Sequence, residues 1–340
     1  MNPSFALAAM PTELSDAYRL VGHDLDAVFA LIHESLTDRN RLMGEILDYS
    51  FKLGGKRLRP LLVLLTGKAT GELTENHLRV AAALEMIHTG TLVHDDILDG
   101  ASFRRHLETL HVRWESKTAV LAGDYLLTRA ISLITATSDM NCYNAVAAAC
   151  RTTCEGELLQ TVTQGDFALS LADYERIIGG KTASLLECST RLGAYFSGAS
   201  ETTVGQFGLF GRSLGMAFQI LDDLLDLTGS TQTMGKTLGT DLRNRKPTLP
   251  LILFLRSAGI SEKKSMLERL RRDTLSDDDC AWVVRTLDES GSLAAARRSA
   301  EEQIDAGLKA LDLVRAAHNC SQAAYDALES LARFVLSRNC

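Results

Sequence analysis

The chain has 340 residues, which is long enough to bury a large hydrophobic core. It is 46% hydrophobic but only 6% aromatic, and it contains five prolines; this composition favours an all-α protein. The net charge of −7 at pH 7 offers no basic surface, which argues against a nucleic acid as partner. We expect one domain over residues 1–340, with residues 1–12 loose.

The cysteines and the N-terminus bear on the cellular compartment. The seven cysteines include no CxxC pair, and no basic flank with a long apolar region precedes the first expected helix. No apolar run approaches the length needed to span a bilayer. These features predict a cytoplasmic protein in a reducing environment.

Apolar residues recur at helical spacing through most of the chain. Three amphipathic helices are expected from Ser261 onward, and the segment 104–114 is expected to be a loop. Glu155, Glu157 and Gln160 are expected to face partly inward from their helix. The earlier helical segments are 14–36, 43–51, 78–94, 118–134, 145–162, 173–192 and 204–227.

The first basic segment is GGKRLRP, residues 54–60. Its two glycines allow a sharp turn, and Pro60 suits the first turn of the helix that follows. Lys56, Arg57 and Arg59 beside a helix start indicate a phosphate site. The alternative is a basic surface loop.

The stretch from Glu85 to Arg105 carries the first acidic cluster. Asp95 and Asp99 are four residues apart and share a helix face, with Asp96 between them. Grouped carboxylates repel one another unless a cation neutralises them, and hard oxygen ligands suit magnesium. Arg104 and Arg105 follow one turn later, and a guanidinium binds phosphate in bidentate fashion.

The acidic spacing recurs at Asp222, Asp223 and Asp226, again after an apolar helical run. Gln219 lies on the same face as the outer two acids. Two such helices facing each other across a cavity can hold a small metal cluster. A single DDxxD string arises by chance on helix surfaces, whereas two followed by basic residues indicate a metal and phosphate site.

Two further segments place cations near the expected site. Gly179 and Gly180 interrupt a helical pattern just before Lys181 and Thr182, which indicates a kink that aims both side chains at a ligand. Two helices joined by a tight turn are the alternative. The segment 235–250 adds more basic residues after the second acidic cluster.

These segments together resemble the trans-type (E-type) isoprenyl diphosphate synthases, in that family's order and spacing from Gly54 to Leu255. The chain is most similar to the bacterial long-chain branch, the octaprenyl and solanesyl diphosphate synthases. The resemblance implies an all-α barrel of antiparallel helices around a deep cavity, usually homodimeric. The motifs that carry it are GGKRLRP, HTGTLVHDDILDGASFRR, AGDYLL, KTA, FQILDDLLD and GKTLGTDLRNRKPTLPLI.

The family's activity implies a reaction in which an allylic diphosphate ionises and isopentenyl diphosphate attacks the resulting carbocation. The resemblance implies two or three Mg²⁺ ions held by Asp95, Asp99 and Asp222, with Asp96, Asp223 and Asp226. It implies that the allylic diphosphate contacts Arg104, Lys181, Lys236 and Lys246, and that isopentenyl diphosphate contacts Lys56, Arg59, His88 and Arg105. Thr182 and Gln219 are implied to orient the reacting groups.

The chain departs from the family at His106 and Arg245, where glycine is usual, and at Glu108, where proline is usual. In the family, the fifth residue before the first acidic motif helps set the cavity floor. Here that residue is Gly90, with Met86 one turn deeper, which predicts products beyond twenty carbons and peripheral membrane contact at most during their release. The alternative is that Gly90 only lets two helices pack closely.

Other functions remain open at this point. A terpene cyclase or a head-to-head synthase also needs acidic helices, but neither needs a site for isopentenyl diphosphate, which GGKRLRP indicates. A non-catalytic subunit of a heteromeric synthase could lose one acidic cluster, whereas both are intact here. A helical scaffold with incidental acidic patches is the remaining alternative.

Overall fold

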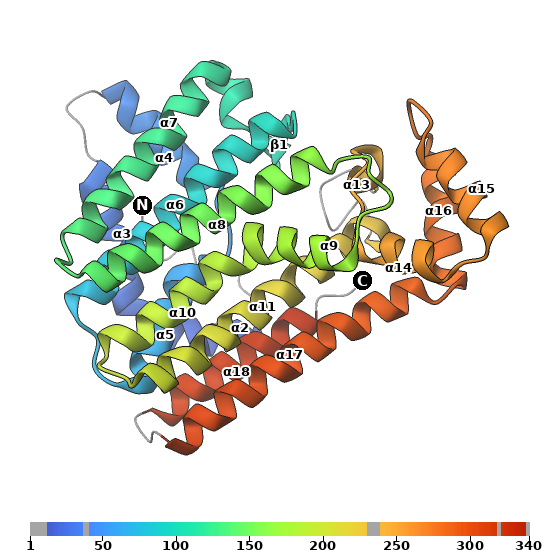
Figure 1. The fold of residues 1–340 in the computed structure, drawn as a ribbon. Helices are drawn as coiled ribbons and strands as arrows, with labels where there is room; N and C mark the ends of the chain where they lie inside the picture. Colours follow the sequence, from blue (N-terminus) through green and yellow to red (C-terminus); the bar gives the residue numbers. More distant parts are fainter. Residues whose placement is uncertain (1–11, 37–40, 230–238, 318–320, 338–340) are drawn as a thin grey trace. The chain divides into compact units, whose positions relative to one another are not determined.

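The computed structural model describes residues 12–36, 41–229, 239–317 and 321–337 (Figure 1). The described part is almost wholly helical, which confirms the all-α prediction, and its strands form one two-stranded antiparallel hairpin. The expectation of a loose segment over residues 1–12 falls almost entirely outside the described residues. The α-helices are α2 (Thr12–Leu20), α3 (Gly22–Leu36), α4 (Arg41–Lys52), α5 (Leu58–Thr70), α6 (Glu75–Leu98), α7 (Leu110–Thr135), α8 (Met140–Val162), α9 (Leu171–Ile178), α10 (Ser184–Phe196), α11 (Glu201–Thr228), α13 (Thr240–Arg243), α14 (Leu249–Ser257), α15 (Ile260–Leu270), α16 (Asp277–Glu289), α17 (Ser292–Ala317) and α18 (Gln322–Ser337).

The chain divides into two compact units. The first unit comprises residues 1–150, 185–211 and 310–331, and the second comprises residues 151–184, 212–309 and 332–340. One domain over the whole chain stays a prediction.

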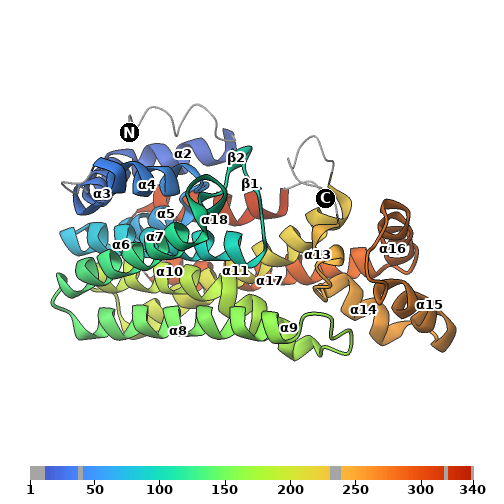
Figure 2. The ribbon, with the colours of Figure 1, turned by 90° about the horizontal axis from the view of Figure 1, so that it is seen from above.

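Helix α6 is the centre of the first unit, packing against α3, α5 and α7. Its residues from Val80 to Ile87 are all buried, because they are apolar or small with one exception, Glu85. Figure 2 shows α2, α3 and α4 lying over α5, α6 and α7. The end of α6 therefore emerges from a rigid core, and this is where the first acidic cluster begins.

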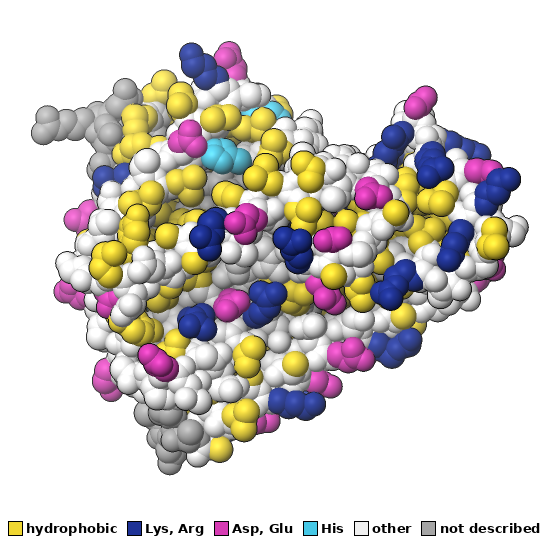
Figure 3. Space-filling model, viewed as in Figure 1, with side chains coloured by type: hydrophobic (Ala, Val, Ile, Leu, Met, Phe, Trp, Pro, Cys, Tyr) yellow, Lys and Arg dark blue, Asp and Glu magenta, His cyan; other side chains and the backbone are white. Residues whose placement is uncertain are grey.

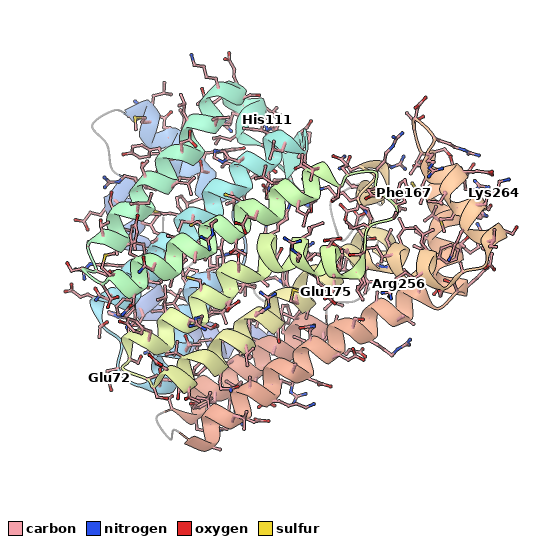
Figure 4. All side chains as sticks on the ribbon, viewed as in Figure 1. Glu72, His111, Phe167, Glu175, Arg256 and Lys264 are labelled. Atoms are coloured by element: carbon pink, nitrogen blue, oxygen red, sulfur yellow. The ribbon has the colours of Figure 1, made fainter. Side chains whose placement is uncertain are left out.

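Two regions of the first unit differ from expectation. Residues 14–36 form two helices, α2 and α3, not one. Residues 104–114 are not a plain loop: the hairpin β1 (Phe103–Arg104) and β2 (Leu107–Glu108) is followed directly by α7. The backbone leaves helical geometry at Trp114 and Glu115, so the regular part of α7 starts close to the predicted position. His111, labelled in Figure 4, lies in the first turn and contacts the hydroxyl of Thr109.

The second unit is built on a separate apolar cluster, in which residues from α11, α13, α14, α15 and α16 meet. Phe167, labelled in Figure 4, packs against this cluster from the segment after α8. The described residues from 260 onward form four helices, not the three expected, because Ser276 caps α16 and separates it from α15. Within the described residues, no helix is long and apolar enough to cross a membrane.

Candidate active site

The first acidic motif divides into two surface acids and one buried acid. Asp95 is half-buried and Asp99 is exposed at the end of α6, where its N–H donates to the carbonyl of Asp95 at 2.8 Å. Asp96 is only 2% exposed, because the helix turns it inward. The predicted spacing of Asp95 and Asp99 on one face therefore holds, whereas the middle acid points elsewhere.

Asp96 is the partner of Arg104. The Nε of Arg104 lies 2.8 and 3.0 Å from the two carboxylate oxygens of Asp96, and its Nη2 lies 2.8 Å from Oδ1. Arg104 comes from β1 and retains 23% exposure of its side chain. This pair joins the hairpin to the end of α6 and fixes the guanidinium of Arg104 on the middle acid of the motif.

The hairpin turn sets the position of Arg105. Arg105 and His106 have φ values of 51° and 65°, the left-handed pair that a two-residue hairpin requires. A side chain at Gly55 would collide with the guanidinium of Arg105, so the two basic segments meet there. The structure thus brings Arg105 and the GGKRLRP segment together, as the predicted isopentenyl diphosphate site requires.

The GGKRLRP segment begins at a turn in which the N–H of Gly54 donates to the carbonyl of Phe51, and it adopts a left-handed conformation at Arg57. Arg57 has a φ of 52°, whereas neither Gly54 nor Gly55 adopts a positive φ. The guanidinium of Arg57 donates to Oε1 of Glu85 at 2.7 Å and to the carbonyl of Phe51. The glycines leave room for the guanidinium groups of Arg57 and Arg105, and Arg57 anchors the loop to α6.

Three predicted isopentenyl diphosphate ligands lie near this anchor. Lys56 is half-buried, and its carbonyl accepts a hydrogen bond from Tyr18. Arg59 is buried, and burial lowers its pKa to about 10, partly offset by Glu85. The pKa of His88 is lowered well below its usual value, first by burial and then by four surrounding arginines. Burial and the arginines thus favour the neutral imidazole of His88, and the lysine and the arginines carry the positive charge here.

The second acidic motif, in the second unit, repeats the division of the first. Asp222 and Asp226 are half-buried, while Asp223 is buried. The hydroxyl of Tyr174 donates to Oδ2 of Asp223 at 2.8 Å, and Nε2 of Gln219 donates to Oδ1 at 2.9 Å. The pKa of Asp223 is raised to about 8, chiefly by burial and then by Asp241. A cation bound nearby would favour its charged form.

Thr182 and Gln219 belong to the same chain of hydrogen bonds. The hydroxyl of Thr182 donates to Oε1 of Gln219 at 2.6 Å, which fixes the orientation of the amide that reaches Asp223. Tyr174 lies on α9, whose next residue, Glu175, is labelled in Figure 4. The sequence analysis did not identify Tyr174, because its partner Asp223 is distant in the chain, although both residues lie in segments predicted to be helical.

Lys181 lies in a π-helical turn, Gly179–Ala183, that continues α9 into α10. A π turn therefore lies where the glycine pair predicts an interruption of regular α-helix, and single π turns are frequent at functional sites. A kink that aims Lys181 and Thr182 at a ligand stays a prediction. Lys181, Gln219, Asp223, Asp241 and Lys246 line a cavity of about 80 Å³ in the second unit. The buried hydroxyl of Thr248, also in the lining, has no hydrogen-bond partner in the described part of the chain. The cavity lining thus contains two lysines and a buried hydroxyl that has no hydrogen-bond partner among the described residues.

Lys246 is 3.8 Å from Oδ1 of Asp241, and the N–H of Asp241 donates to Oδ2 of Asp226 at 2.9 Å. These contacts tie the segment after the second motif back to its last acid. The other predicted cation of this segment, Lys236, lies outside the described residues. The mutual placement of the two acidic motifs across one cavity stays a prediction.

The acidic motifs suit a metal that keeps much of its hydration. Their donors are hard carboxylate oxygens, which magnesium prefers. Among the described residues, no three His, Cys, Asp or Glu side chains form a group able to hold an ion alone. Asp96 and Asp223 point into the protein and accept hydrogen bonds there, so two outer acids per motif remain as candidate metal ligands. Magnesium usually completes its shell with water and substrate phosphates, so two carboxylates per motif fit it.

Two of the three departures from the family pattern adopt left-handed backbone conformations. His106 and Arg245 have φ values of 65° and 52°, which glycine adopts without steric cost. Glycine is thus the unstrained residue at both positions. Arg245 gains a compensating contact, because its Nη2 donates to the carbonyl of Arg272 at 2.8 Å. Glu108 pairs with Phe103 in the hairpin.

The predicted chain-length residues lie in the core of the first unit. Met86 and Gly90 are both buried. A Cβ at Gly90 would lie 3.1 Å from the carbonyl oxygen of Gly123 on α7. This geometry favours the packing alternative for Gly90, since the helices approach closely there. A role of Gly90 and Met86 in chain length stays a prediction.

Comparisons with known proteins agree with this geometry. The polyprenyl synthetase family model matches residues 40–287. Octaprenyl diphosphate synthase of Escherichia coli (strain K12) is 32% identical over 295 residues, covering 87% of this chain and 91% of that protein. The all-trans-nonaprenyl-diphosphate synthase (geranyl-diphosphate specific) of Rhodobacter capsulatus is 33% identical over 320 residues, covering 94% and 96%.

Among solved structures, the polyprenyl synthase from Caulobacter crescentus CB15, complexed with calcium and isoprenyl diphosphate, is similar with a TM-score of 0.88. It is 34% identical, and the match covers 96% of this chain and 98% of that one. The family match spans both acidic motifs and the basic segments around them. The chain therefore belongs to the polyprenyl synthetase family.

Proposed function

We propose that this chain is a trans-polyprenyl diphosphate synthase that condenses isopentenyl diphosphate onto an allylic diphosphate and releases diphosphate. Farnesyl or geranylgeranyl diphosphate is the proposed allylic substrate. The observation that carries the proposal is that cationic side chains lie beside the buried acid of each acidic motif. Arg104 is fixed by Asp96 in the first motif, and Lys181 and Lys246 line the cavity of Asp223 in the second.

The cations divide between two diphosphates. Arg104, Lys181, Lys236 and Lys246 are assigned to the allylic diphosphate, whose departure leaves an allylic carbocation. Lys56, Arg59, His88 and Arg105 are assigned to isopentenyl diphosphate. The contact of Arg105 with Gly55 supports this second group, because it joins two segments distant in sequence. Thr182 and Gln219 are assigned to orient the reacting groups.

Divalent metal fits the outer acids of both motifs. Asp95, Asp99, Asp222 and Asp226 would hold two or three Mg²⁺ ions together with the substrate phosphates. Magnesium, when bound, supplies positive charge to the departing diphosphate. Asp96 and Asp223 support the site by orienting Arg104 and Gln219. The calcium in the similar Caulobacter crescentus structure is consistent with a divalent-metal site.

The product is proposed to exceed twenty carbons. The similar proteins include an octaprenyl and a nonaprenyl diphosphate synthase, each matched over most of its length. A long polyprenyl tail is poorly soluble, so we propose peripheral membrane contact at release, in a protein that acts in the cytoplasm.

We also propose a homodimer. Helices α7 and α8 expose large apolar side chains that a monomer would leave in water. Figure 3 shows apolar side chains gathered on the face over α7. Exposed large apolar side chains of α7 and α8 include Val120, Leu121, Ile131, Met140 and Tyr143. Leu121→Asp should shift the protein from dimer to monomer in sedimentation velocity, and an unchanged sedimentation coefficient would refute this interface.

The direct test incubates the purified chain with Mg²⁺, labelled isopentenyl diphosphate and farnesyl diphosphate. Label in a polyprenyl diphosphate longer than twenty carbons supports the proposal, and a hydrocarbon product would indicate a cyclase or a head-to-head synthase. A chain that is inactive alone but activates a second synthase would be a regulatory subunit. Asp95→Ala and Asp222→Ala should each reduce turnover by orders of magnitude while circular dichroism remains unchanged.

A further inference from the structure

An ion pair holds the lysine of the π turn. Nζ of Lys181 lies 2.5 Å from Oε1 of Glu157 on α8, and the two side chains are 21% and 20% exposed. Glu157 faces partly inward, as expected, whereas Glu155 on the same helix is exposed. A partly buried charge pair interacts more strongly than one in open water, because fewer water molecules screen it.

The pair is enforced by backbone packing. A Cβ at Gly180 would lie 2.6 Å from the carbonyl oxygen of Thr152, and one at Gly156 would lie 2.5 Å from the backbone nitrogen of Lys181. Only glycines allow α8 and the π turn to touch in this way. Glu157 follows one glycine and Lys181 follows the other, so the contact sets the two charges face to face.

A second contact fixes the same packing of α8 against the π turn. The hydroxyls of Thr153 and Ser184 lie 2.8 Å apart, both buried, and the hydroxyl of Ser184 donates to the carbonyl of Gly180 at 2.6 Å. The carboxylate therefore cannot withdraw from Lys181 by moving its helix. It can only share the lysine with another anion or swing away by rotating its own side chain.

We propose that the carboxylate of Glu157 competes with diphosphate for Lys181. This competition weakens diphosphate binding in the second unit and so promotes the release of diphosphate in every elongation cycle. The inference rests on the proposed role of Lys181 as an allylic diphosphate ligand. A lysine ammonium carries three donors, so it can bind a diphosphate and a carboxylate together. The carboxylate takes one donor and repels the incoming anion.

The consequence matters most for a long product. Each condensation liberates one diphosphate, which must leave before the elongated chain can bind as the next allylic substrate. An enzyme that bound diphosphate through unopposed cations would be slowed by its own product at every cycle. Glu157 opposes this binding without removing the cation that ionisation requires.

The test measures binding of inorganic pyrophosphate with Mg²⁺ to the full-length protein by calorimetry. Glu157→Gln keeps the shape and removes the charge, and we expect its pyrophosphate dissociation constant to fall about threefold to tenfold. The constant for competitive inhibition by pyrophosphate should fall by a similar factor. The matched control is Glu155→Gln on the exposed face of α8, which should leave both constants unchanged. An unchanged or weaker affinity in Glu157→Gln would overturn the proposal.

A double variant shows whether the effect passes through Lys181. In a Lys181→Met background, Glu157→Gln should strengthen pyrophosphate binding by a clearly smaller factor; an equal factor would overturn the proposed competition. If Glu157→Gln does not fold, Glu157→Asp should show a smaller gain in affinity, and its absence would equally overturn the proposal. Wild-type protein that binds pyrophosphate but elongates no substrate would instead refute the proposed function.

Discussion

The substitution Asp96→Asn separates the buried acid of the first motif from its two neighbours. In the wild-type protein, Asp96 accepts hydrogen bonds from Nε and Nη2 of Arg104 at 2.8 to 3.0 Å and is 2% exposed. Asparagine keeps the volume but removes the charge. Arg104 would then be left half-buried without its anion, and its guanidinium would lose the position that we assign to binding the allylic diphosphate.

The size of the effect follows from the burial of both partners. Removing one partner of a buried ion pair costs about 3–5 kcal/mol. Since 23% of the Arg104 side chain is exposed, water can partly replace the lost carboxylate, and we expect a loss of about 2–3 kcal/mol. For a chain of this length, whose unfolding entropy is about 0.7 kcal/mol/K, that corresponds to a decrease in Tm of roughly 3–4 °C.

Asp99→Asn is the matched control within the same motif. Asp99 is exposed at the C-terminal end of α6, where a negative charge is unfavourable for the helix dipole and is repelled by Asp95. Its replacement should therefore change the stability by about 0.5 kcal/mol or less, in the stabilising direction. The two substitutions in one motif are thus expected to have opposite signs.

The assay is thermal unfolding in EDTA without substrate, which removes stabilisation by ligands. Steady-state turnover should decrease in both variants, for different reasons: a displaced Arg104 in Asp96→Asn and a lost metal ligand in Asp99→Asn. Asp96→Asn as stable as the wild type, or an equal loss of stability in Asp99→Asn, would refute this account of the motif.

Three further predictions concern other positions. His106→Gly should increase the free energy of unfolding by about 0.5–1 kcal/mol in urea, because glycine adopts a φ of 65° without strain, and His106→Ala should bring no such gain. Lys56→Ala should mainly raise the KM for isopentenyl diphosphate and Lys181→Ala that for the allylic substrate; identical kinetic signatures would contradict the division of the site. Gly90→Tyr should lower the free energy of unfolding by about 1–3 kcal/mol, because the carbonyl oxygen of Gly123 leaves no room for a ring; a shortened product from a variant of unchanged stability would instead support a chain-length role.

Local patterns in the sequence predicted most of the helical segments and the identity of the acidic clusters, but not every helix boundary. The spacing of Asp95 and Asp99 places them on one helix face, because helical periodicity depends only on neighbours along the chain. The glycine pair before Lys181 likewise predicted a kink, and the structure has a π turn there. The matched basic segments were sufficient to predict the family, which the comparisons confirm.

The tertiary structure alone decided which partner each charged group has. Asp96 pairs with Arg104 because a hairpin folds back onto α6, and Asp223 binds Tyr174 across two separate helices. Glu157 meets Lys181 only because two glycines let their backbones touch. Such contacts depend on how distant segments pack, and a periodic pattern carries no information about that packing. The sequence therefore determined which cationic residues are available to bind a diphosphate. Packing decided which of these cations are paired with a carboxylate of the protein.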